Sequence, residues 1–438
     1  MQNHCRETGR IYIETYGCQM NKADSEVVMA LLEEHGFCRA SSADDAGIIL
    51  INTCIVREHA QEKAVANISH YKRYKNNENN VRVGVLGCMA SGAGEMLAER
   101  LPFLDWILGP DAYRSLPELI AEANHEMPII RMHGIEDELY DEIGPSRREG
   151  INAWVVINRG CSNHCTYCVV PGARGEERYR PAKSIFKEVE EAVNDGYPQV
   201  TLLGQNVNSW SDTNLDFADL LKSVADTPGL KRVRFITSHP KDCSEKLLVT
   251  MSTSDVICPE LHLPVQSGSN RILKLMGRKY TREHYLDLAG KALDMIPGLL
   301  LSTDIIVGFP GESLNDYFQT EELARMIEYD DAYVYRYSER PGTPAARMID
   351  DVPEDVKIER LQKIGAIIRR SGRKKRQDLV GKTLLVLVEG ASAKSPDERM
   401  GRTQAGHIVV FPGDVAAGEE VYVNLKNLSG YTLIGERI

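Results

Sequence analysis

The stretch GCSNHCTYCVVPGARGEERYRP, from Gly160 to Pro181, follows a run typical of a buried β-strand, Ala153–Asn158. Within it, Cys161, Cys165 and Cys168 form a C-x3-C-x2-C pattern on one short loop. Three thiolates from one loop can hold three irons of a 4Fe–4S cluster and leave the fourth iron open to a small molecule. Because active sites of α/β folds lie at the carboxyl ends of parallel strands, the position of this loop predicts an active site.

A structural zinc site is the alternative for this loop, with His164 as a fourth ligand beside the three thiolates, because Cys3His sites are common. His164 is adjacent to Cys165 in the chain, and neighbouring residues rarely both reach one tetrahedral ion. Structural zinc usually draws a second pair of ligands from farther along the chain. The sequence favours the iron–sulfur cluster and leaves zinc as the alternative.

Downstream of this loop, β-type runs alternate with helical patterns, which is typical of α/β folds. Six strands are fewer than the eight of a complete TIM barrel, so the pattern predicts a partial (β/α)6, TIM-like barrel. The predicted strands are Ala153–Asn158, Gln199–Gly204, Arg232–Thr237, Glu260–Leu263, Leu300–Val307 and Ala332–Tyr337, and the clearest helices are Ala182–Asp195, Phe217–Asp226 and Ser313–Glu328.

The first part of the chain shows the same alternation, which predicts an amino-terminal α/β domain with a parallel sheet. Its strands are predicted at Ile11–Thr15, Gly47–Asn52 and Val81–Gly87, and its helices at Asp24–His35, Glu58–Tyr74 and Glu95–Leu101.

The tail from Gly381 onward changes to short β runs broken by glycine, proline and aspartate, which predicts a small antiparallel β-barrel suited to binding. These runs are Leu384–Glu389, His407–Phe411 and Glu420–Leu425. The charged, glycine- and proline-rich segment Glu136–Gly150 looks like a linker. The sequence therefore predicts a multidomain α/β protein with an amino-terminal domain at 1–135, a linker at 136–150, the partial barrel at 151–376 and the small β-barrel at 377–438.

Three further cysteines share a position in the predicted amino-terminal sheet. Cys18, Cys54 and Cys88 each fall just past the end of a predicted strand, in IYIETYGC, IILINTC and VGVLGC. The carboxyl ends of parallel strands share one edge of the sheet, so these loops should bring the three thiols together. A lone cysteine is more often a small buried apolar residue, but three in one topological position predict a second 4Fe–4S cluster with an open iron.

The composition is that of a globular protein. Hydrophobic residues make up 42% of the chain and charged residues 26%, and the formal net charge is −11. The longest apolar stretch, Gly298–Phe309, is too short to span a bilayer, and the first ten residues lack the apolar core of a signal peptide. We therefore expect a cytoplasmic protein with no membrane partner and with reduced thiols, in which Cys5, Cys38, Cys243 and Cys258 are inert.

The negative net charge argues against nucleic-acid binding through overall charge, but one local patch is strongly basic. The run RRSGRKKR lies on the flank of a helix predicted to start near Pro353, and it could face solvent or contact phosphates. Its cations are Arg369, Arg370, Arg373, Lys374, Lys375 and Arg376.

Long segments throughout the chain resemble a known family, the methylthiotransferases of the radical S-adenosylmethionine (SAM) superfamily. The matching segments are YGCQMNKADSE, LINTCIVREHAQEK, LGCMAS, GCSNHCTYCVVPGARGEERYRP, LLGQNVNSW, TSHP, LHLPVQSGS, DIIVGFPGE and RPGTPA. The β tail looks like the TRAM-type RNA-binding domain of this family. One departure is Gly172, where the tRNA enzymes of the family carry a bulky aromatic residue.

The resemblance implies SAM contacts within the first cysteine loop and in later loops of the chain. Tyr167 would lie against the adenine, and Gly204 and Gln205, at the end of the second barrel strand, would meet the methionyl amine by backbone groups. Gln266 matches a ribose-binding position, and Arg278 matches one that pairs with the methionyl carboxylate. Asp304 and the turn that begins at Gly308 look like the adenine side.

For the reaction, the resemblance implies a transferase that adds a methylthio group to carbon 2 of N6-isopentenyladenosine, next to the anticodon of tRNA. It implies two 4Fe–4S clusters and two SAM molecules, one giving a methyl group to sulfur and the other a 5′-deoxyadenosyl radical that takes hydrogen from carbon 2. The base would be extruded from the anticodon stem-loop to reach the clusters. The implied protein partners are an electron donor, such as flavodoxin or ferredoxin, and iron–sulfur carrier proteins.

Two rival functions follow from the same residues. The first keeps the radical chemistry but moves it to N6-threonylcarbamoyladenosine in tRNA or to a ribosomal protein. Gln19 and Met20, which follow Cys18, argue for tRNA, because the ribosomal-protein branch has Pro–Lys there. The second rival is a zinc-stabilised RNA-binding protein without catalysis, which a metal analysis would distinguish by its zinc content.

Overall fold

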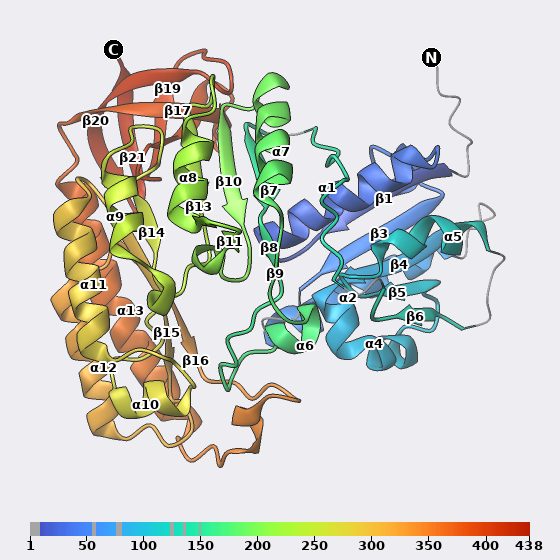
Figure 1. Cartoon of the computed structure of the whole chain (residues 1–438), viewed down its shortest axis with the longest axis horizontal. Helices are drawn as coiled ribbons and strands as arrows, with labels where there is room; N and C mark the ends of the chain where they lie inside the picture. Colours follow the sequence, from blue (N-terminus) through green and yellow to red (C-terminus); the bar gives the residue numbers. More distant parts are fainter. Residues whose placement is uncertain (1–8, 55–57, 76–80, 123–126, 135–136, 149) are drawn as a thin grey trace. The chain divides into compact units, whose positions relative to one another are not determined.

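A computed structural model describes residues 9–54, 58–75, 81–122, 127–134, 137–148 and 150–438 (Figure 1). The chain divides into two compact units. Unit 1 comprises residues 1–148, 156–164 and 168–185, and unit 2 comprises residues 149–155, 165–167 and 186–438. Cys5 and the first residue of the predicted linker, Glu136, lie outside the described residues.

Unit 1 is built on a six-stranded parallel sheet of order β2-β1-β3-β4-β5-β6, which confirms the predicted amino-terminal fold class. All six residues of the central strand β3 are buried, as expected of a parallel strand covered on both faces. The strands are β1 (Arg10–Thr15), β2 (Cys38–Arg39), β3 (Ile48–Thr53), β4 (Arg82–Gly87), β5 (Trp106–Leu108) and β6 (Ile129–Arg131), and the helices are α1 (Gln19–Glu34), α2 (Glu58–His70), α3 (Lys72–Lys75), α4 (Cys88–Arg100) and α5 (Leu116–Ala121).

Alternate residues of the sheet enter two separate cores, one on each face. Ile49 and Ile51 pack in one core, and Ile48 and Leu50 pack in the other, because successive side chains of a strand point to opposite faces. Part of the predicted linker also belongs to the second core, since Tyr140 and Ile143 are buried there. The segment therefore has the irregular backbone that its composition predicts, but apolar side chains anchor it to the domain.

A second part of unit 1 comes from the segment that carries the C-x3-C-x2-C loop. It forms a two-stranded antiparallel ribbon of β8 (Asn158–Arg159) and β9 (Arg178–Tyr179), with the short helix α6 (Val170–Arg174) between them. Helix α6 packs against α4 of the amino-terminal domain. Unit 1 therefore joins residues from both predicted domains, which the alternation of strands and helices does not reveal.

In unit 2 the six predicted barrel strands are all present, in two three-stranded sheets of order β13-β10-β7 and β14-β15-β16. Register pairs show β10 parallel to β13, and β15 parallel to β14 and β16. The strands are β7 (Asn152–Val156), β10 (Gln199–Leu203), β13 (Arg232–Phe235), β14 (Glu260–His262), β15 (Leu300–Val307) and β16 (Asp331–Arg336), and the hairpin strands are β11 (Ser211–Asp212) and β12 (Leu215–Asp216). The helices are α7 (Ala182–Asn194), α8 (Phe217–Ala225), α9 (Glu245–Ser252), α10 (Asn270–Leu275), α11 (Arg282–Met295), α12 (Leu314–Ile327) and α13 (Glu354–Gln377).

The tail of unit 2 is a closed five-stranded barrel of order β17-β18-β19-β21-β20. The prediction of an antiparallel barrel needs one correction, because β19 and β21 pair in parallel to close it. Closure leaves no edge strand unpaired, and the interior is filled by valine, leucine and phenylalanine side chains. The strands are β17 (Thr383–Ala391), β18 (Glu398–Thr403), β19 (Ile408–Pro412), β20 (Glu420–Ser429) and β21 (Thr432–Arg437).

Two arginines of β13 join this barrel to the sheet within unit 2. The side chain of Arg232 is buried, and it donates to the Arg402 carbonyl at 2.8 Å and to Glu420 at 2.9 Å. Arg234 donates to the carbonyl of Gln404 at 2.8 Å. Both arginines thus bind backbone carbonyls that a side chain change in the barrel would not remove.

Two remaining predictions concern cysteines and the membrane. Cys243 and Cys258 are buried thiols, as expected, but Cys38 is disulfide-bonded, so the prediction of an inert thiol is wrong for that residue. A disulfide requires two cysteines with a suitable separation and direction in the fold, which their spacing in the sequence does not show. Within the described segments, every helix is too short or too polar to cross a bilayer.

Candidate functional site

The first candidate site lies in unit 1, at the carboxyl edge of three neighbouring strands. Cys18 follows β1 and precedes α1, Cys54 follows β3, and Cys88 is the first residue of α4 after β4. These strands are adjacent in the order β1-β3-β4. Gly17 shows how closely the first two loops approach, because a Cβ atom at that position would lie 2.6 Å from the Cys54 Cβ.

The thiols at this edge interact with one another. A hydrogen bond between the Cys18 and Cys54 side chains lowers the pKa of Cys18 to about 6, and the nearby Arg174 guanidinium acts in the same direction. Burial raises the pKa of the Cys88 thiol, and Arg174 opposes that rise. Cys18 thus has thiolate character at neutral pH, and metal ions and clusters bind thiolates. The predicted convergence of these three loops is present in the structure.

Arg174 is the residue of this site that sequence reasoning missed. Its Nε donates to the Cys88 sulfur at 3.0 Å, and its Nη2 donates to an Asp24 oxygen at 2.8 Å. Nη2 also reaches the Asn21 amide oxygen at 3.4 Å, and the Cys18 thiol donates to that same oxygen at 3.7 Å. Arg174 therefore contacts one thiol directly and a second through Asn21.

Asp24 carries a second cation, Arg159, whose Nη1 lies 2.8 Å from the other Asp24 oxygen. The side chains of Asp24, Arg159 and Arg174 are all at least nine-tenths buried. Burial alone would raise the pKa of Asp24, but the two guanidinium groups outweigh it and lower that pKa. A charged group in this position is stable only because its partners are buried with it.

The second candidate site is the C-x3-C-x2-C loop, whose residues belong to both units. In unit 1, Cys161 is buried and its N–H donates to the Gly175 carbonyl, while the Cys168 sulfur accepts the N–H of Val170 at 3.5 Å. In unit 2, the buried Cys165 accepts a hydrogen bond from Arg278 at 3.4 Å.

No group of three or more His, Cys, Asp or Glu side chains is close enough to hold one metal ion in the described part of the chain. A 4Fe–4S cluster makes a different demand, because each thiolate binds a separate iron and the ligands stand farther apart than around one ion.

Gln205 fits a polar ligand better than any other predicted SAM contact. It follows β10, next to the buried Gly204, and its Oε1 is buried without a hydrogen-bond partner among the described residues. A buried acceptor of this kind is costly unless a ligand supplies a donor. The sequence predicts that an amine meets backbone groups of this loop, and the side-chain oxygen of Gln205 offers a further acceptor beside them.

Other predicted SAM contacts have protein partners. Arg278 donates through Nη2 to the Pro264 carbonyl at 3.1 Å and through Nε to the Tyr280 hydroxyl at 2.9 Å, in addition to Cys165. The Tyr167 ring meets the Phe309 ring edge-on, with centroids 6.4 Å apart. Tyr167 therefore has the packing role that an aromatic residue at this position would have without any cofactor.

Gln266 and Asp304 lie on neighbouring segments of unit 2. Gln266 has a φ of +66°, which is unusual for a residue other than glycine, and its N–H donates to the Asp304 carbonyl at 2.8 Å. The Asp304 carboxylate lies 3.5 Å from the Nε2 atom of His262. Backbone strain of this kind clusters at ligand sites, and here it lies beside the polar side chains of Gln266 and Asp304.

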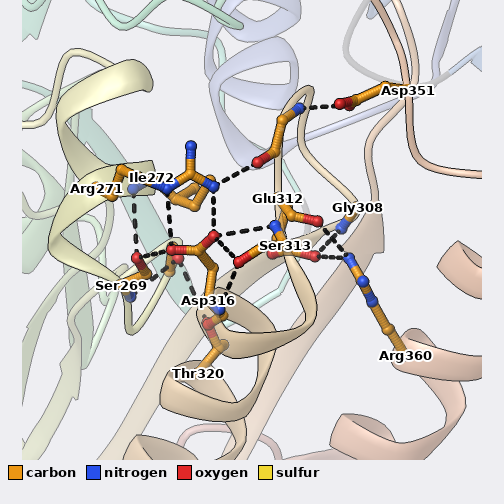
Figure 2. A network of polar contacts seen from close by, with 12 residues as sticks. Ser269, Arg271, Ile272, Gly308, Glu312, Ser313, Asp316, Thr320, Asp351 and Arg360 are labelled. Atoms are coloured by element: carbon orange, nitrogen blue, oxygen red, sulfur yellow. Dashed lines mark hydrogen bonds and ion pairs between the residues drawn. The ribbon is translucent and has the colours of Figure 1, made fainter.

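The turn at Gly308 is held by a buried polar network (Figure 2). The N–H of Gly308 donates to Glu312 Oε2 at 2.7 Å, and Arg360 of α13 donates to the same oxygen at 2.6 Å. A Cβ atom at Gly308 would collide with the Lys357 side chain, and its φ is +67°, so this turn requires glycine.

Asp316 forms the other half of the network in Figure 2. Its carboxylate accepts from the Ser269 hydroxyl at 2.6 Å and pairs with Arg271, and its backbone is part of the capping box that begins α12 at Ser313. Although burial would raise the pKa of Asp316, these hydrogen bonds lower it. The network joins the loops after β14 and β15, where the structure places Gln266 and Gly308.

We predict that Glu312→Gln lowers the free energy of unfolding by about 2–3 kcal/mol, because Arg360 loses a charged hydrogen-bond partner while the Gly308 N–H keeps an acceptor. Urea denaturation would measure the loss. Glu321→Gln is the matched control, since Glu321 pairs with the exposed Arg325 on α12 and its loss should cost under about 1 kcal/mol. Equal losses in the two variants would contradict the prediction.

The predicted RNA-binding cations lie on the last turns of α13. Arg369, Arg370, Arg373 and Lys374 are exposed, whereas Lys375 pairs with Asp330 at 2.8 Å. Arg376 has a structural role, because it is buried and donates to the Asp330 and Gly372 carbonyls. Its guanidinium carbon also lies 4.7 Å from the centre of the Tyr431 ring, next to the carboxyl-terminal barrel.

Family models match three segments of the chain. Residues 10–109 match the Uncharacterized protein family UPF0004, residues 155–324 match the Radical SAM superfamily, and residues 377–438 match the TRAM domain. Among solved structures, the radical SAM methyltransferase TsrM from Kitasatospora setae has a TM-score of 0.58 at 14% identity, over 77% of this chain and 75% of that chain. The cobalamin-dependent radical enzyme OxsB has a TM-score of 0.56 at 12% identity, over 84% and 56%. These likenesses show the fold.

Similar curated proteins extend over nearly the whole chain and carry one name, tRNA-2-methylthio-N(6)-dimethylallyladenosine synthase. The protein from Clostridium botulinum strain Langeland is 41% identical over 98% of this chain and 97% of its own length. Those from Moorella thermoacetica and Phocaeicola vulgatus are 42% and 43% identical, over 97% and 99% of this chain and 98% and 96% of their own lengths. The cysteine loop, the TRAM barrel and these relatives together identify the chain as a member of the radical SAM tRNA methylthiotransferase family.

Proposed function

We propose that this enzyme adds a methylthio group to carbon 2 of N6-isopentenyladenosine, beside the anticodon of tRNA, with two 4Fe–4S clusters and two molecules of SAM. The convergence of Cys18, Cys54 and Cys88 at one sheet edge carries the proposal of a second cluster. The name of the relatives, which specifies the dimethylallyl form of the nucleoside, supports the choice of substrate.

Each cluster would have its own set of thiolates. Cys161, Cys165 and Cys168 would hold the cluster that binds SAM, which supplies a radical able to remove hydrogen from an unactivated C–H bond. The three thiols of unit 1 would hold the cluster that presents sulfur. The lowered pKa of Cys18 helps this assignment, because a thiolate binds iron without first losing a proton.

The chain's own residues would bind and orient SAM. Gln205 offers its unpaired buried oxygen to the amine, and Arg278, which bonds Cys165, places a positive charge beside the cluster thiolate and near a carboxylate bound there. The network around Glu312 and Asp316 keeps the turn at Gly308 in one conformation. These side chains would hold the backbone of the site in one conformation before SAM binds. The site would therefore be preorganised for its ligand.

The TRAM barrel and the exposed cations of α13 would hold the stem of the tRNA. We predict that replacing Arg369, Arg370, Arg373 and Lys374 together with glutamine weakens tRNA binding. The slope of the log of the association constant against the log of the salt concentration should become less steep by up to about 3, because each lost phosphate contact removes about 0.7–0.9 from its magnitude. Fluorescence anisotropy with an anticodon stem-loop over a salt series would measure it.

The matched control for that experiment is Lys187→Gln together with Lys291→Gln, which neutralises exposed lysines of α7 and α11, each paired with a carboxylate four residues away on its own helix. Their loss should leave the slope unchanged. A slope that stays the same in the α13 variant would contradict an RNA-binding role for these cations.

Mass spectrometry of tRNA nucleosides from cells that lack the protein tests the proposed function most directly. The methylthio derivative of N6-isopentenyladenosine should disappear, with the isopentenyl precursor accumulating, and the gene for this chain should restore it. Loss of a methylthio derivative of threonylcarbamoyladenosine instead would assign the other tRNA substrate. An anaerobically reconstituted chain should contain about eight irons, as two cubane clusters require.

A further inference from the structure

Arg174 of unit 1 has three properties that the proposed reaction does not explain. It is buried, it donates to the sulfur of Cys88 at 3.0 Å, and it pairs with the buried Asp24 at 2.8 Å. A guanidinium has five N–H donors in a fixed plane, so contact with a sulfur on one edge and a carboxylate on another fixes the whole group.

Arg159 and Arg174 bring two positive charges to Asp24, the one carboxylate that pairs with them among the described residues. The Cys18 thiolate acts on Arg174 from nearby. A second buried cation is costly unless a negative group lies beside it. The Cys88 sulfur is in contact with Arg174, and as the thiolate of a bound cluster it would supply that negative charge.

One donor of Arg174 also lacks an acceptor. Its Nη1 is buried and has no hydrogen-bond partner among the described residues, although Nε and Nη2 both have one. Inorganic sulfides and thiolates of iron–sulfur clusters accept hydrogen bonds of this kind. The residues of unit 1 therefore fit a cluster in two independent ways, through charge and through an unused donor.

Helix α6 connects this arrangement to the other set of thiols. The N–H of Val170, at its first residue, donates to the Cys168 sulfur at 3.5 Å, and Arg174, at its last residue, donates to the Cys88 sulfur. Five residues thus separate a ligand of the SAM-binding cluster from a contact to the other cluster.

We propose that Arg174 is a positioning residue of the amino-terminal cluster, which holds the Cys88 thiolate in place and stabilises the reduced, more negative state of that cluster. The inference rests on the proposed second cluster. Hydrogen bonds to cluster sulfurs and nearby positive charge both raise the reduction potential. In the proposed reaction, a radical at carbon 2 would bond to the methylated sulfur of this cluster as the bond from that sulfur to iron breaks, and one electron would remain on the cluster. Arg174 would favour uptake of that electron.

The test uses the full chain with Cys161, Cys165 and Cys168 replaced by alanine, so that only the amino-terminal cluster remains. In this parent we expect Arg174→Gln to move the midpoint potential of the cluster to a more negative value and to change the electron paramagnetic resonance spectrum of its reduced form. Arg174→Lys keeps the charge but not the planar geometry, and we expect a smaller shift in the same direction.

Arg159→Gln is the matched control. Arg159 is as deeply buried as Arg174 and pairs with the other oxygen of the same carboxylate, but among the described residues it contacts no cysteine. The midpoint potential of the cluster in the Arg159→Gln variant should stay closer to the parent value than the potential in the Arg174→Gln variant. A shift as large as that of Arg174→Gln would overturn the proposal, because a general loss of charge would then explain both results.

The remaining outcomes also decide the question. If Arg174→Gln fails to retain the cluster while Arg159→Gln retains it, the positioning role is supported; if both fail alike, a folding defect explains them and the proposal is overturned. An unchanged potential and spectrum in Arg174→Gln would overturn the inference alone. A parent chain that binds no iron would overturn the proposed second cluster, and the role of Arg174 with it.

Discussion

Replacing Cys18, Cys54 and Cys88 together with alanine should reduce methylthiolation of tRNA to background while SAM is still cleaved to 5′-deoxyadenosine. The reason is that the three thiols lie on the edge of the unit 1 sheet, whereas the C-x3-C-x2-C loop keeps all three of its own cysteines. The two activities can therefore be separated by substitution. Chromatography of the nucleosides and of 5′-deoxyadenosine, from one anaerobic reaction, measures both.

Cys243→Ala with Cys258→Ala provides the matched control, because these thiols are buried in unit 2 and burial raises the pKa of each. Neither residue belongs to either set of three cysteines, so this variant should keep both activities and its full iron content. Methylthiolation that survives in the triple variant would refute the assignment of sulfur delivery to unit 1. The triple variant should also contain about four irons where the parent contains about eight.

The second large effect concerns stability. Asp24→Asn should lower the free energy of unfolding by about 3–5 kcal/mol, because it leaves two buried guanidinium groups without a counter-charge. Urea denaturation followed by circular dichroism would show the loss in the metal-free chain.

Adding Arg159→Gln to Asp24→Asn removes one of the two uncompensated cations. The double variant should therefore lose less stability than the sum of the two single variants, since the residues interact directly. Strict additivity would contradict the view that one carboxylate balances both arginines. Asp216→Asn is a suitable reference, because Asp216 pairs with Lys246 at an exposed position and its loss should cost under about 1 kcal/mol.

Predictions from the sequence succeeded where a periodic pattern and a topological rule apply together. Each strand that precedes Cys18, Cys54 or Cys88 was visible as an apolar run, and the rule that parallel strands end at one edge then placed the thiols side by side. The short strands β5 and β6, of three residues each, were missed because so few residues show no alternation. Helix α4 begins at Cys88 rather than at Glu95 because its first turns contain small residues without a helical apolar pattern.

Pairing between distant residues had no signal in one sequence. Arg174 lies 86 residues from Cys88 and 150 residues from Asp24, so neither spacing nor periodicity links them. The sequence analysis of this segment concerned its cysteines and made no prediction for its arginines. The buried role of Arg376 was missed because a run of six cations predicts a solvated face and one of them turned inward.

The attachment of the carboxyl-terminal barrel to β13 fixes the position of that barrel within unit 2. Because Arg232 and Arg234 of β13 donate to backbone carbonyls of the barrel, a tRNA stem bound to that barrel would stay fixed relative to the sheet that contains β13. On the proposal that the barrel holds the stem, an RNA hairpin with a longer or shorter loop would present a different nucleotide to the enzyme. Substrate selection would then depend on the length of the loop as well as on the base.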